Sequence, residues 1–445
     1  MQVQASPKLR NRVGTNGEVG FDDSSCDRKT NCLVERAYQR PVDAYLAAWA
    51  GWTLDAFDFT AFLLIIAPIA KEFNVPVPEV AAVLTITLWM RLIGATTSGW
   101  LADRIGRRTP LMISIAWYSV CNFLAGLAPS FFLLFLFRAL LGIGMGAEWP
   151  AGAALAMETW PARSRGFMGA VMQGSWGIGF LLSSAIYGLF YDYIGWRGLL
   201  MIGIAPALLI IYIRLFVNEP EIWVENQRLQ KEQKREVRAP LFSIFKPQML
   251  GNTLTTCLMM ASAFVIYYAN YALFATHLQL DLHLSPALVA LPIALANTCF
   301  FLSSLFWGWL AERVGRRWAI IIPAALGVPT AFLYLLTQDY ALIVIGFALQ
   351  GMFACGGMHV QYPAYLSERF PTEVRATAVA FCFHQGAIWG GLISPLLILY
   401  ATTHQIGLSG PILVTTVVGL AIFLVAVLLS PETKGKVLVA DLTVA

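Results

Sequence analysis

Charged residues are scarce in this chain of 445 residues. Asp, Glu, Lys and Arg together make up 13% of it, and hydrophobic residues make up 58%. A soluble globular protein carries about 25% charged residues, and it needs them to cover its surface with polar groups. The mean hydropathy of +0.65 therefore excludes a soluble enzyme and indicates a protein that lies largely in lipid.

Cysteine pairs and metal-binding clusters are also lacking. The seven cysteines show no paired spacing, and the apolar runs contain neither a cluster of metal ligands nor a nucleophile with a neighbouring base. These absences argue against a disulfide framework, a zinc site and a membrane enzyme. We expect no metal, no cofactor and no nucleic-acid partner. The first 40 residues are polar and of mixed charge, so we expect no cleavable signal peptide.

Twelve long apolar runs predict an all-α membrane protein with twelve transmembrane helices. The runs cover roughly residues 44–70, 80–101, 110–128, 131–156, 166–190, 197–217, 250–275, 287–310, 318–337, 340–366, 376–400 and 409–430. They divide the chain into a disordered cytoplasmic tail (1–43), a first six-helix half (44–217), a cytoplasmic linker (218–249), a second six-helix half (250–430) and a cytoplasmic tail (431–445).

Lysine and arginine are distributed unequally between the two sides of the membrane. The side that includes the N-terminal tail has 26 of these residues, and the opposite side has two. Cytoplasmic loops of membrane proteins carry this excess of positive charge. We therefore expect an integral protein of the cytoplasmic (inner) membrane with both termini in the cytoplasm.

Two segments recur at nearly constant separation. Residues 99–108 (GWLADRIGRR) return as residues 308–317 (GWLAERVGRR) after 209 residues, and residues 158–165 (ETWPARSR) are echoed by residues 368–375 (ERFPTEVR) after 210 residues. Because each half has an even number of spans, both halves have the same orientation in the membrane. The pattern predicts a parallel repeat about an axis along the membrane normal.

The twelve spans, the two halves and the repeated decapeptide together resemble the major facilitator superfamily of secondary transporters, over about residues 44–430. Within it, residues 52–59, 142–149 and 195–198 are similar to the sialate:proton symporter family, which includes sialic acid transporters and monocarboxylate permeases. Residues 267–277 depart from the His- and Gln-Asp-containing pattern of fungal lactate permeases. The resemblance implies two halves that rock about a central site, with helices 1 and 4 adjacent.

The repeated decapeptide is the candidate gate. An acid such as Asp103, near a helix end, can accept hydrogen bonds from backbone N–H groups or pair with an arginine across the boundary between the halves. The arginines can contact lipid headgroups and the loop between helices 4 and 5, or act only as topology anchors. Such a cluster can latch the cytoplasmic side and release as the halves rock. We assign to this gate Gly99, Asp103, Arg104, Gly106, Arg107, Arg108, Glu312, Arg313 and Arg317.

Five ionisable residues lie within the predicted spans, namely Asp55, Asp58, Arg91, Arg138 and Glu148. A charge at a helix centre costs about 2.5–3.5 kcal/mol, whereas a leucine contributes only about 0.3–0.6 kcal/mol. Each of the five should therefore face a partner or a water-filled cavity. From the helical rise, Asp55, Asp58 and Arg91 lie about 16, 21 and 16 Å from the cytoplasmic ends of their spans, near the midplane. Arg138 is within reach of Asp58 if helices 1 and 4 are adjacent.

These charges allow two interpretations. They form an inert ion pair that fixes the packing of the first half, or they bind a substrate anion and a proton. In the second interpretation Asp58 is the first candidate to carry the proton, ahead of Asp55 and Glu148. Arg138 is the first candidate to bind the anion, and Arg91 is its competitor. The second half offers uncharged donors that could equally be core residues: Asn270, Tyr271, His359 and His384.

We predict proton-coupled import, by symport, of a small organic anion such as a monocarboxylate or a sialic-acid-like sugar acid. A negative cell interior opposes anion entry by about 2.3 kcal/mol per 100 mV, and one accompanying proton removes that opposition. The partners are then the substrate, protons and the lipid bilayer, and we expect a monomer. The alternatives are a transporter of a neutral solute or drug and a membrane sensor that binds a solute without moving it.

Overall fold

The computed structural model describes residues 28–235, 237, 240–271 and 273–440. Helices form most of this part of the chain, and no β-strand occurs in it. The all-α class is therefore confirmed. Met1–Gln39 and Arg40–Ala445 are two compact units, and both halves of the predicted repeat lie in the second unit.

The first half is built from helices that end close to the predicted positions. They are α1 (Arg28–Leu64), α2 (Ile66–Phe73), α3 (Val77–Ile105), α4 (Arg108–Gly126), α5 (Phe131–Thr159), α6 (Arg165–Ile202) and α7 (Ala207–Phe216). Helix α1 begins before the predicted residue 44, because the preceding segment contains strong helix formers such as Leu33, Glu35 and Ala37. The tail was predicted to be disordered up to residue 43; its residues 1–27 lie outside the described residues, and the remainder is helical.

Two short helices, α8 (Glu221–Glu232) and α9 (Pro240–Ser243), lie within the predicted linker. The second half then follows as α10 (Pro247–Tyr271), α11 (Phe274–Leu280), α12 (Pro286–Val314), α13 (Arg316–Leu335), α14 (Tyr340–Met352), the π-helix η2 (Phe353–Gly357), α15 (Tyr362–Arg369), α16 (Arg375–His404) and α17 (Ser409–Leu428). Together α14, η2 and α15 occupy the single span predicted over 340–366.

The helices are long enough to cross a membrane. Among the described residues ten helical segments pass the test of length and hydropathy, and the bent pair α1–α2 makes eleven. The segment over 165–216 has 52 residues and would be about 78 Å long, more than twice the hydrocarbon thickness of about 30 Å. It breaks at Gly195, where φ is 62°. This break falls between two predicted spans. Counting the two parts of the segment separately raises the number from eleven to the predicted twelve.

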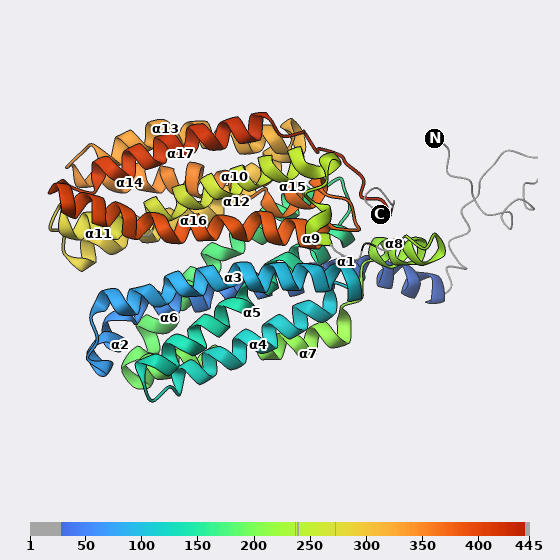
Figure 1. Ribbon diagram of the computed structural model, residues 1–445, viewed down its shortest axis with the longest axis horizontal. Coiled ribbons are helices and arrows are strands. Elements are labelled where there is room, and N and C mark those ends of the chain that lie inside the picture. The colour runs from blue at the N-terminus through green and yellow to red at the C-terminus, as the bar shows by residue number, and fades with distance from the viewer. Residues whose placement is uncertain (1–27, 236, 238–239, 272, 441–445) are drawn as a thin grey trace, which may run out of the picture. The chain divides into compact units, whose positions relative to one another are not determined.

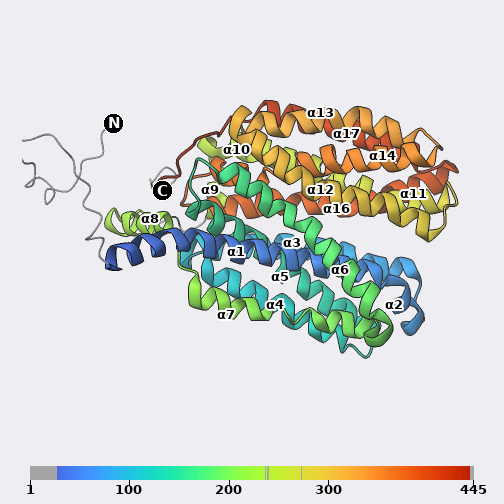
Figure 2. The same ribbon diagram turned by 180° about the vertical axis from the view of Figure 1, so that it is seen from behind.

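The helices of the two halves form two bundles that lie side by side (Figures 1 and 2). Across the boundary α3 packs against α16, and α6 packs against α12. Gly99 makes the first approach possible, because a Cβ atom there would lie 2.8 Å from the carbonyl oxygen of Ala376. Its repeat counterpart Gly308 serves the second approach, where a Cβ would lie 2.8 Å from the Cβ of Ala170. Both copies of the decapeptide are therefore held against the opposite half.

Candidate functional site

The first buried ion pair joins α1 and α3. Arg91 Nη2 donates to both carboxylate oxygens of Asp55, at 3.0 and 3.2 Å. Asp55 is fully buried, and Arg91 is 4% exposed. The Nε–H of Arg91 has no acceptor among the described residues. The charge of Arg91 also acts on Tyr268 of α10 and on His384 of α16, so this pair lies at the boundary between the halves.

A second ion pair joins α1 and α5 one turn further along. Asp58 Oδ2 lies 3.3 Å from Arg138 Nη1, so the structure brings together the two residues that the depth estimate placed within reach. Asn122 of α4 bridges them: its amide nitrogen donates to Asp58, and its oxygen accepts from Arg138 at 3.0 Å. The Arg138 guanidinium also lies over the ring of Phe62, 4.3 Å from its centroid. All these partners belong to the first half, so this cluster is internal to it.

Two nitrogens of Arg138, Nε and Nη2, have no acceptor among the residues that the structure describes. A guanidinium has five N–H donors in a planar fork, and this one uses few of them. Arg91 likewise keeps its Nε–H unused. Both arginines therefore have N–H donors that can bind an anion.

Glu148 of α5 is a third buried acid. It is fully buried, and neither of its carboxylate oxygens has a hydrogen-bond partner within the described part of the chain. Its Oε1 lies against α1, where a Cβ atom at Gly51 would overlap it at 2.2 Å. It interacts electrostatically with Asp55 and Arg91. An ionised carboxylate is costly in such a place unless it is paired, which makes Glu148 a candidate to hold a proton.

Three of the predicted donors of the second half lie in an aromatic cluster. Tyr271 stacks on Tyr267 with 4.9 Å between ring centroids, and Tyr267 lies 5.7 Å from the ring of His359. His384 lies 6.2 Å from the ring of Trp149 in the first half. The Tyr271 hydroxyl, His359 Nδ1 and His384 Nε2 have no hydrogen-bond partner among the described residues. Each of the three has a polar atom to offer a ligand.

Asn270 does not join this group. Its amide nitrogen donates to the carbonyl oxygen of Ile266 at 2.7 Å and to Thr416 Oγ1 at 2.9 Å, and its amide oxygen accepts from the Tyr334 hydroxyl. Both N–H groups are used inside the second half, so the amide is not free to bind a substrate in this conformation. The prediction overlooked partners that are far away in the sequence.

The first copy of the gate joins the two halves at the end of the bundle that the sequence predicts to be cytoplasmic. Asp103, at the end of α3, accepts hydrogen bonds from the backbone N–H groups of Ala376 (3.1 Å) and Thr377 (2.9 Å) and from the Thr377 hydroxyl (2.7 Å). These amides open helix α16 of the opposite half. The first N–H groups of a helix have no intrahelical acceptor and favour a negative charge. Asp103 was expected to bond either to backbone N–H groups or to an arginine across the boundary. The structure shows the bonds to backbone N–H groups.

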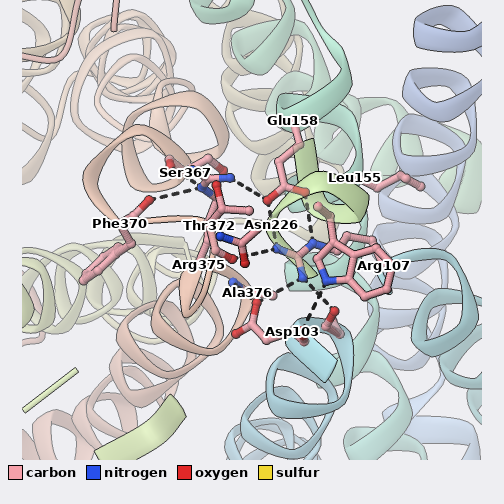
Figure 3. Close-up of polar contacts among 12 residues, drawn as sticks. Asp103, Arg107, Leu155, Glu158, Asn226, Ser367, Phe370, Thr372, Arg375 and Ala376 are labelled. Carbon is pink, nitrogen blue, oxygen red and sulfur yellow. Dashed lines mark hydrogen bonds and ion pairs between the residues drawn. The ribbon is translucent and has the colours of Figure 1, made fainter. Parts of the chain in front are cut away.

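Glu158 completes this first copy (Figure 3). Arg107 donates to both of its carboxylate oxygens, at 3.0 and 2.9 Å, and Arg375 of the opposite half donates at 2.6 Å. Arg107 was expected at the lipid headgroups and at the loop between helices 4 and 5. It is fully buried, away from the headgroups, and donates to the carbonyl oxygen of Thr372 and to Glu158, which follows the predicted fourth span. Burial alone would lower the pKa of Arg107, but its carboxylate neighbours raise it above its ordinary value.

The second copy of the gate repeats this plan with longer distances. Glu312 accepts from the backbone N–H of Phe167, at the start of α6, at 2.9 Å. Glu368 takes the place of Glu158, but Arg165 lies 3.4 Å from it and Arg316 lies 3.6 Å from it. Both copies thus contain two acids and two arginines in corresponding places. The ion pairs around Glu158 in the first copy are shorter than those around Glu368 in the second copy.

A turn with a positive φ follows each gate acid. Gly106 and Gly315 have φ values of 105° and 104°, which residues with a Cβ rarely adopt. The two backbone N–H groups after each glycine donate to one carboxylate, which is Glu219 in the first copy and Glu432 in the second. The glycines of the decapeptide therefore shape two anchored turns.

The other gate arginines lie at the surface or at helix ends. Arg104 and Arg313 are exposed and lie over the tryptophan four residues earlier, at 5.0 and 4.0 Å from the ring centroid. Arg108 and Arg317 each donate to a backbone carbonyl near the end of the last helix of their half. These four positions fit the expected contact with headgroups better than Arg107 does.

Several residues of the site were not assigned a role from the sequence. They are Asn122, Glu158, Arg165, Glu368 and Arg375. The recurrence of Glu and Arg in the two echoed segments was the available signal for four of them, since an ion pair needs both charges in both copies. Asn122 is a lone amide in an apolar span, which is itself a sign of an internal partner.

Comparisons with known proteins agree with this geometry. The family model described as "Major Facilitator Superfamily" matches residues 48–281 and 256–441. The sialic acid transporter NanX of Escherichia coli (strain K12) is 25% identical over 402 residues, which cover 88% of this chain and 95% of the relative. A probable 4-methylmuconolactone transporter of Cupriavidus pinatubonensis (strain JMP 134 / LMG 1197) is 30% identical over 407 residues, covering 88% and 90%.

Two further proteins extend the comparison. The cis,cis-muconate transport protein of Acinetobacter baylyi (strain ATCC 33305 / BD413 / ADP1) is 25% identical over 401 residues, which cover 88% of this chain and 94% of the relative. The solved structure of the proton:xylose symporter XylE with 6-bromo-6-deoxy-D-glucose superposes with a TM-score of 0.70 at 20% identity, over 90% of this chain and 98% of that chain. With two matched halves, a shared fold and relatives that are transporters rather than enzymes, the chain belongs to the Major Facilitator Superfamily.

Proposed function

We propose that the protein is a proton-coupled symporter of a small organic anion, a monocarboxylate or a sugar acid of the sialic acid kind. The observation that carries this proposal is the pair of buried Asp–Arg contacts in the first half, whose arginines keep unused N–H donors. Buried charges in membrane spans are expensive and mark ion or substrate pathways. Relatives whose names specify sialic acid and cis,cis-muconate support an organic acid as the substrate.

Coupling follows from competition for an arginine. A substrate carboxylate binds the guanidinium bidentately and displaces the aspartate that was paired with it. The displaced aspartate then lies in a low-dielectric site beside a second negative charge, where an ionised carboxylate is unfavourable. It takes up a proton, so the substrate and the proton enter together and the site stays electrically balanced.

For binding the anion, the geometry favours Arg91 over Arg138. For carrying the proton it favours Asp55 over Asp58, although the sequence had favoured Arg138 and Asp58. Arg91 acts electrostatically on Tyr268 and His384 of the second half, so a substrate between the halves can reach it. Arg138 is fully buried among partners of its own half. We therefore assign the anion to Arg91 and the proton to Asp55, with Glu148 close by as a second proton site.

The gate supplies the conformational part of the mechanism. Both copies bond the cytoplasmic helix ends of one half to the other, which holds the cytoplasmic side closed. Alternating access requires these contacts to break as the halves rock. We propose a monomer in the cytoplasmic (inner) membrane with both termini in the cytoplasm. A reporter fused after Ala445 should then be cytoplasmic and a tag near His404 should be accessible from outside; an external C-terminal reporter would contradict this topology.

The test of the proposed function is uptake of a panel of labelled carboxylates into liposomes that contain the purified protein. We expect accumulation only when the outside is made acidic, and we expect a protonophore to abolish it. Arg91→Lys keeps the charge but loses the planar fork, so it should raise the apparent substrate constant about tenfold to a hundredfold. Arg138→Lys is the matched control and should change this constant less. Uptake that is indifferent to the proton gradient would refute symport.

A further inference from the structure

An aromatic stack crosses the boundary between the two halves. Trp149 of α5 and Phe383 of α16 lie face to face, with 3.9 Å between ring centroids and 19° between ring planes. Both side chains are buried, with exposed fractions of 0% and 4%. The indole N–H of Trp149 is bonded within its own half, to Gln173 Oε1 at 3.2 Å. The stack itself is therefore held by the two ring faces and not by a polar contact between the halves.

More rings extend this aromatic surface on both sides. Trp52 lies 5.9 Å from Trp149 and 4.7 Å from Trp176. Trp176 Nε1 donates to the hydroxyl of Tyr267 in the second half at 3.1 Å. Trp149 and Trp176 thus contact aromatic residues of the second half across the boundary that must open during transport, and Trp52 packs against both of them.

The stack adjoins the anion site. Phe383 is followed in the chain by His384, on which the charge of Arg91 acts. Phe264 packs edge-to-face on Phe383 at 5.0 Å and stacks on Tyr268 at 6.2 Å. Tyr268 is the other residue of the second half on which Arg91 acts. A guanidinium and a pair of stacked ring faces therefore lie in the same region of the boundary between the halves.

We infer that the substrate is a planar carboxylate with a conjugated or aromatic body, which lies against Trp149 and Phe383 while its carboxylate binds Arg91. This inference rests on the proposed transport of a carboxylate and narrows its substrate class. In the closed arrangement each ring covers the face of the other. When the halves move apart at this level, both faces lose their partner, and a flat π-system restores the stacking on both sides.

A carboxylate with a saturated body cannot restore the stacking on both ring faces. A puckered ring is thicker than a flat one and lacks the π-quadrupole that makes stacked geometry favourable. A flexible saturated chain must also lose rotamer freedom to lie flat. The site therefore distinguishes ligands of equal charge and nearly equal size by their planarity.

The test measures binding to the purified full-length protein by calorimetry, with two matched pairs of probes at neutral pH. Benzoate is compared with cyclohexanecarboxylate, and trans,trans-2,4-hexadienoate is compared with hexanoate. We expect the planar member of each pair to bind about threefold to tenfold more tightly. Equal dissociation constants within each pair would overturn the inference.

Variants of the stacked rings test whether the Trp149–Phe383 stack is the source of the preference for planar carboxylates. Phe383→Leu keeps apolar volume but removes one ring face, so it should reduce the benzoate preference to less than about twofold. Trp149→Phe keeps a ring and should preserve most of it. The matched control is Phe347→Leu, because Phe347 stacks on Phe274 at the same 3.9 Å but wholly within the second half. If Phe347→Leu changes the preference as much as Phe383→Leu does, the stack between the halves is not its source.

Benzamide separates this inference from the function on which it rests. It has the same flat body as benzoate without the charge. If benzamide binds as tightly as benzoate, anion recognition fails while the planar preference stands. If cyclohexanecarboxylate binds as tightly as benzoate and benzamide does not bind, the carboxylate proposal stands and the planar preference fails.

Discussion

Each half buries a polar cluster between its helices, and the cluster is charged in the first half and uncharged in the second. The first cluster consists of Asp58, Asn122 and Arg138, and the second consists of Asn270, Tyr334 and Thr416. In the first half Asn122 donates to Asp58, and in the second half Tyr334 donates to Asn270. The two halves therefore each hold a hydrogen-bonded polar cluster, once with a carboxylate and once with an amide at its centre.

This difference bears on the two interpretations of the buried charges. The second half packs around an uncharged set of hydrogen-bonded side chains, so a six-helix half of this fold can pack without a buried ion pair of this kind. Replacing a buried ion pair by neutral residues is often without cost to stability. This comparison favours the interpretation on which our proposal rests, in which the charges of the first half bind or move ions.

The two copies of the gate also differ in their contacts. Glu158 holds its two arginines at 2.6 to 3.0 Å, whereas the arginines around Glu368 lie at 3.4 and 3.6 Å. Asp103 accepts three hydrogen bonds from the start of α16, whereas Glu312 accepts one from the start of α6. In the mechanism that we propose, the first copy therefore contributes more to closure of the gate.

The largest expected effect comes from leaving one buried charge unpaired. Asp58→Asn leaves Arg138 without its carboxylate and should destabilise the protein by about 3–5 kcal/mol. The double variant Asp58→Asn with Arg138→Gln makes this cluster uncharged, like the polar cluster of the second half, and should recover most of this loss. Thermal unfolding in detergent measures both. A double variant as unstable as the single one would show that the charges are needed for packing.

Glu158→Gln tests the inequality of the gate. It removes the carboxylate from two buried arginines, Arg107 and Arg375, so we expect a loss of about 3–5 kcal/mol in the stability of the closed state. The matched change Glu368→Gln should cost less, because its ion pairs are longer. The readout is the rate at which a cysteine introduced on the cytoplasmic side of the cavity reacts with a polar thiol reagent. Equal rates in the two variants would contradict the inequality.

Asp103→Asn is expected to have a smaller effect. It keeps the shape of the side chain but loses the negative charge at the start of α16, which contributes about 0.5–2 kcal/mol. Uptake should fall while surface expression stays near normal. Glu312→Gln should reduce uptake less, since Glu312 accepts only one hydrogen bond from the start of α6 and is partly exposed. The idea of a required charge contact fails if Asp103→Asn transports like the unchanged protein.

Much of the fold could be predicted from the sequence, because the length of the apolar runs reports directly on helices that can cross a bilayer, whereas the orientation drawn from Lys and Arg stays a prediction. The repeat of residues 99–108 placed the gate in both halves. Within the site, the cost of buried charge identified Asp55, Asp58, Arg91, Arg138 and Glu148. The depths estimated from the helical rise then placed Arg138 within reach of Asp58, and the structure confirms this contact.

The remainder depended on contacts between residues that are far apart in the chain. Asn270 looked available because its partners Thr416 and Tyr334 cannot be identified from its own helix. Arg107 looked like a surface charge because its partner Glu158 lies on another helix. The choice between Arg91 and Arg138 required knowing which of them faces the second half. Depth along a helix is available from sequence, but direction around its axis is not.

The most direct test of the coupling mechanism is the behaviour of Asp55→Asn in liposomes. Two quantities are measured on one preparation: accumulation of a labelled carboxylate driven by an imposed proton gradient, and exchange of labelled for unlabelled carboxylate without any gradient. Asp55 carries the proton in our mechanism, so the variant should lose accumulation and retain exchange. Accumulation that persists in Asp55→Asn would contradict it, and the proton would then have to move on Asp58 or Glu148.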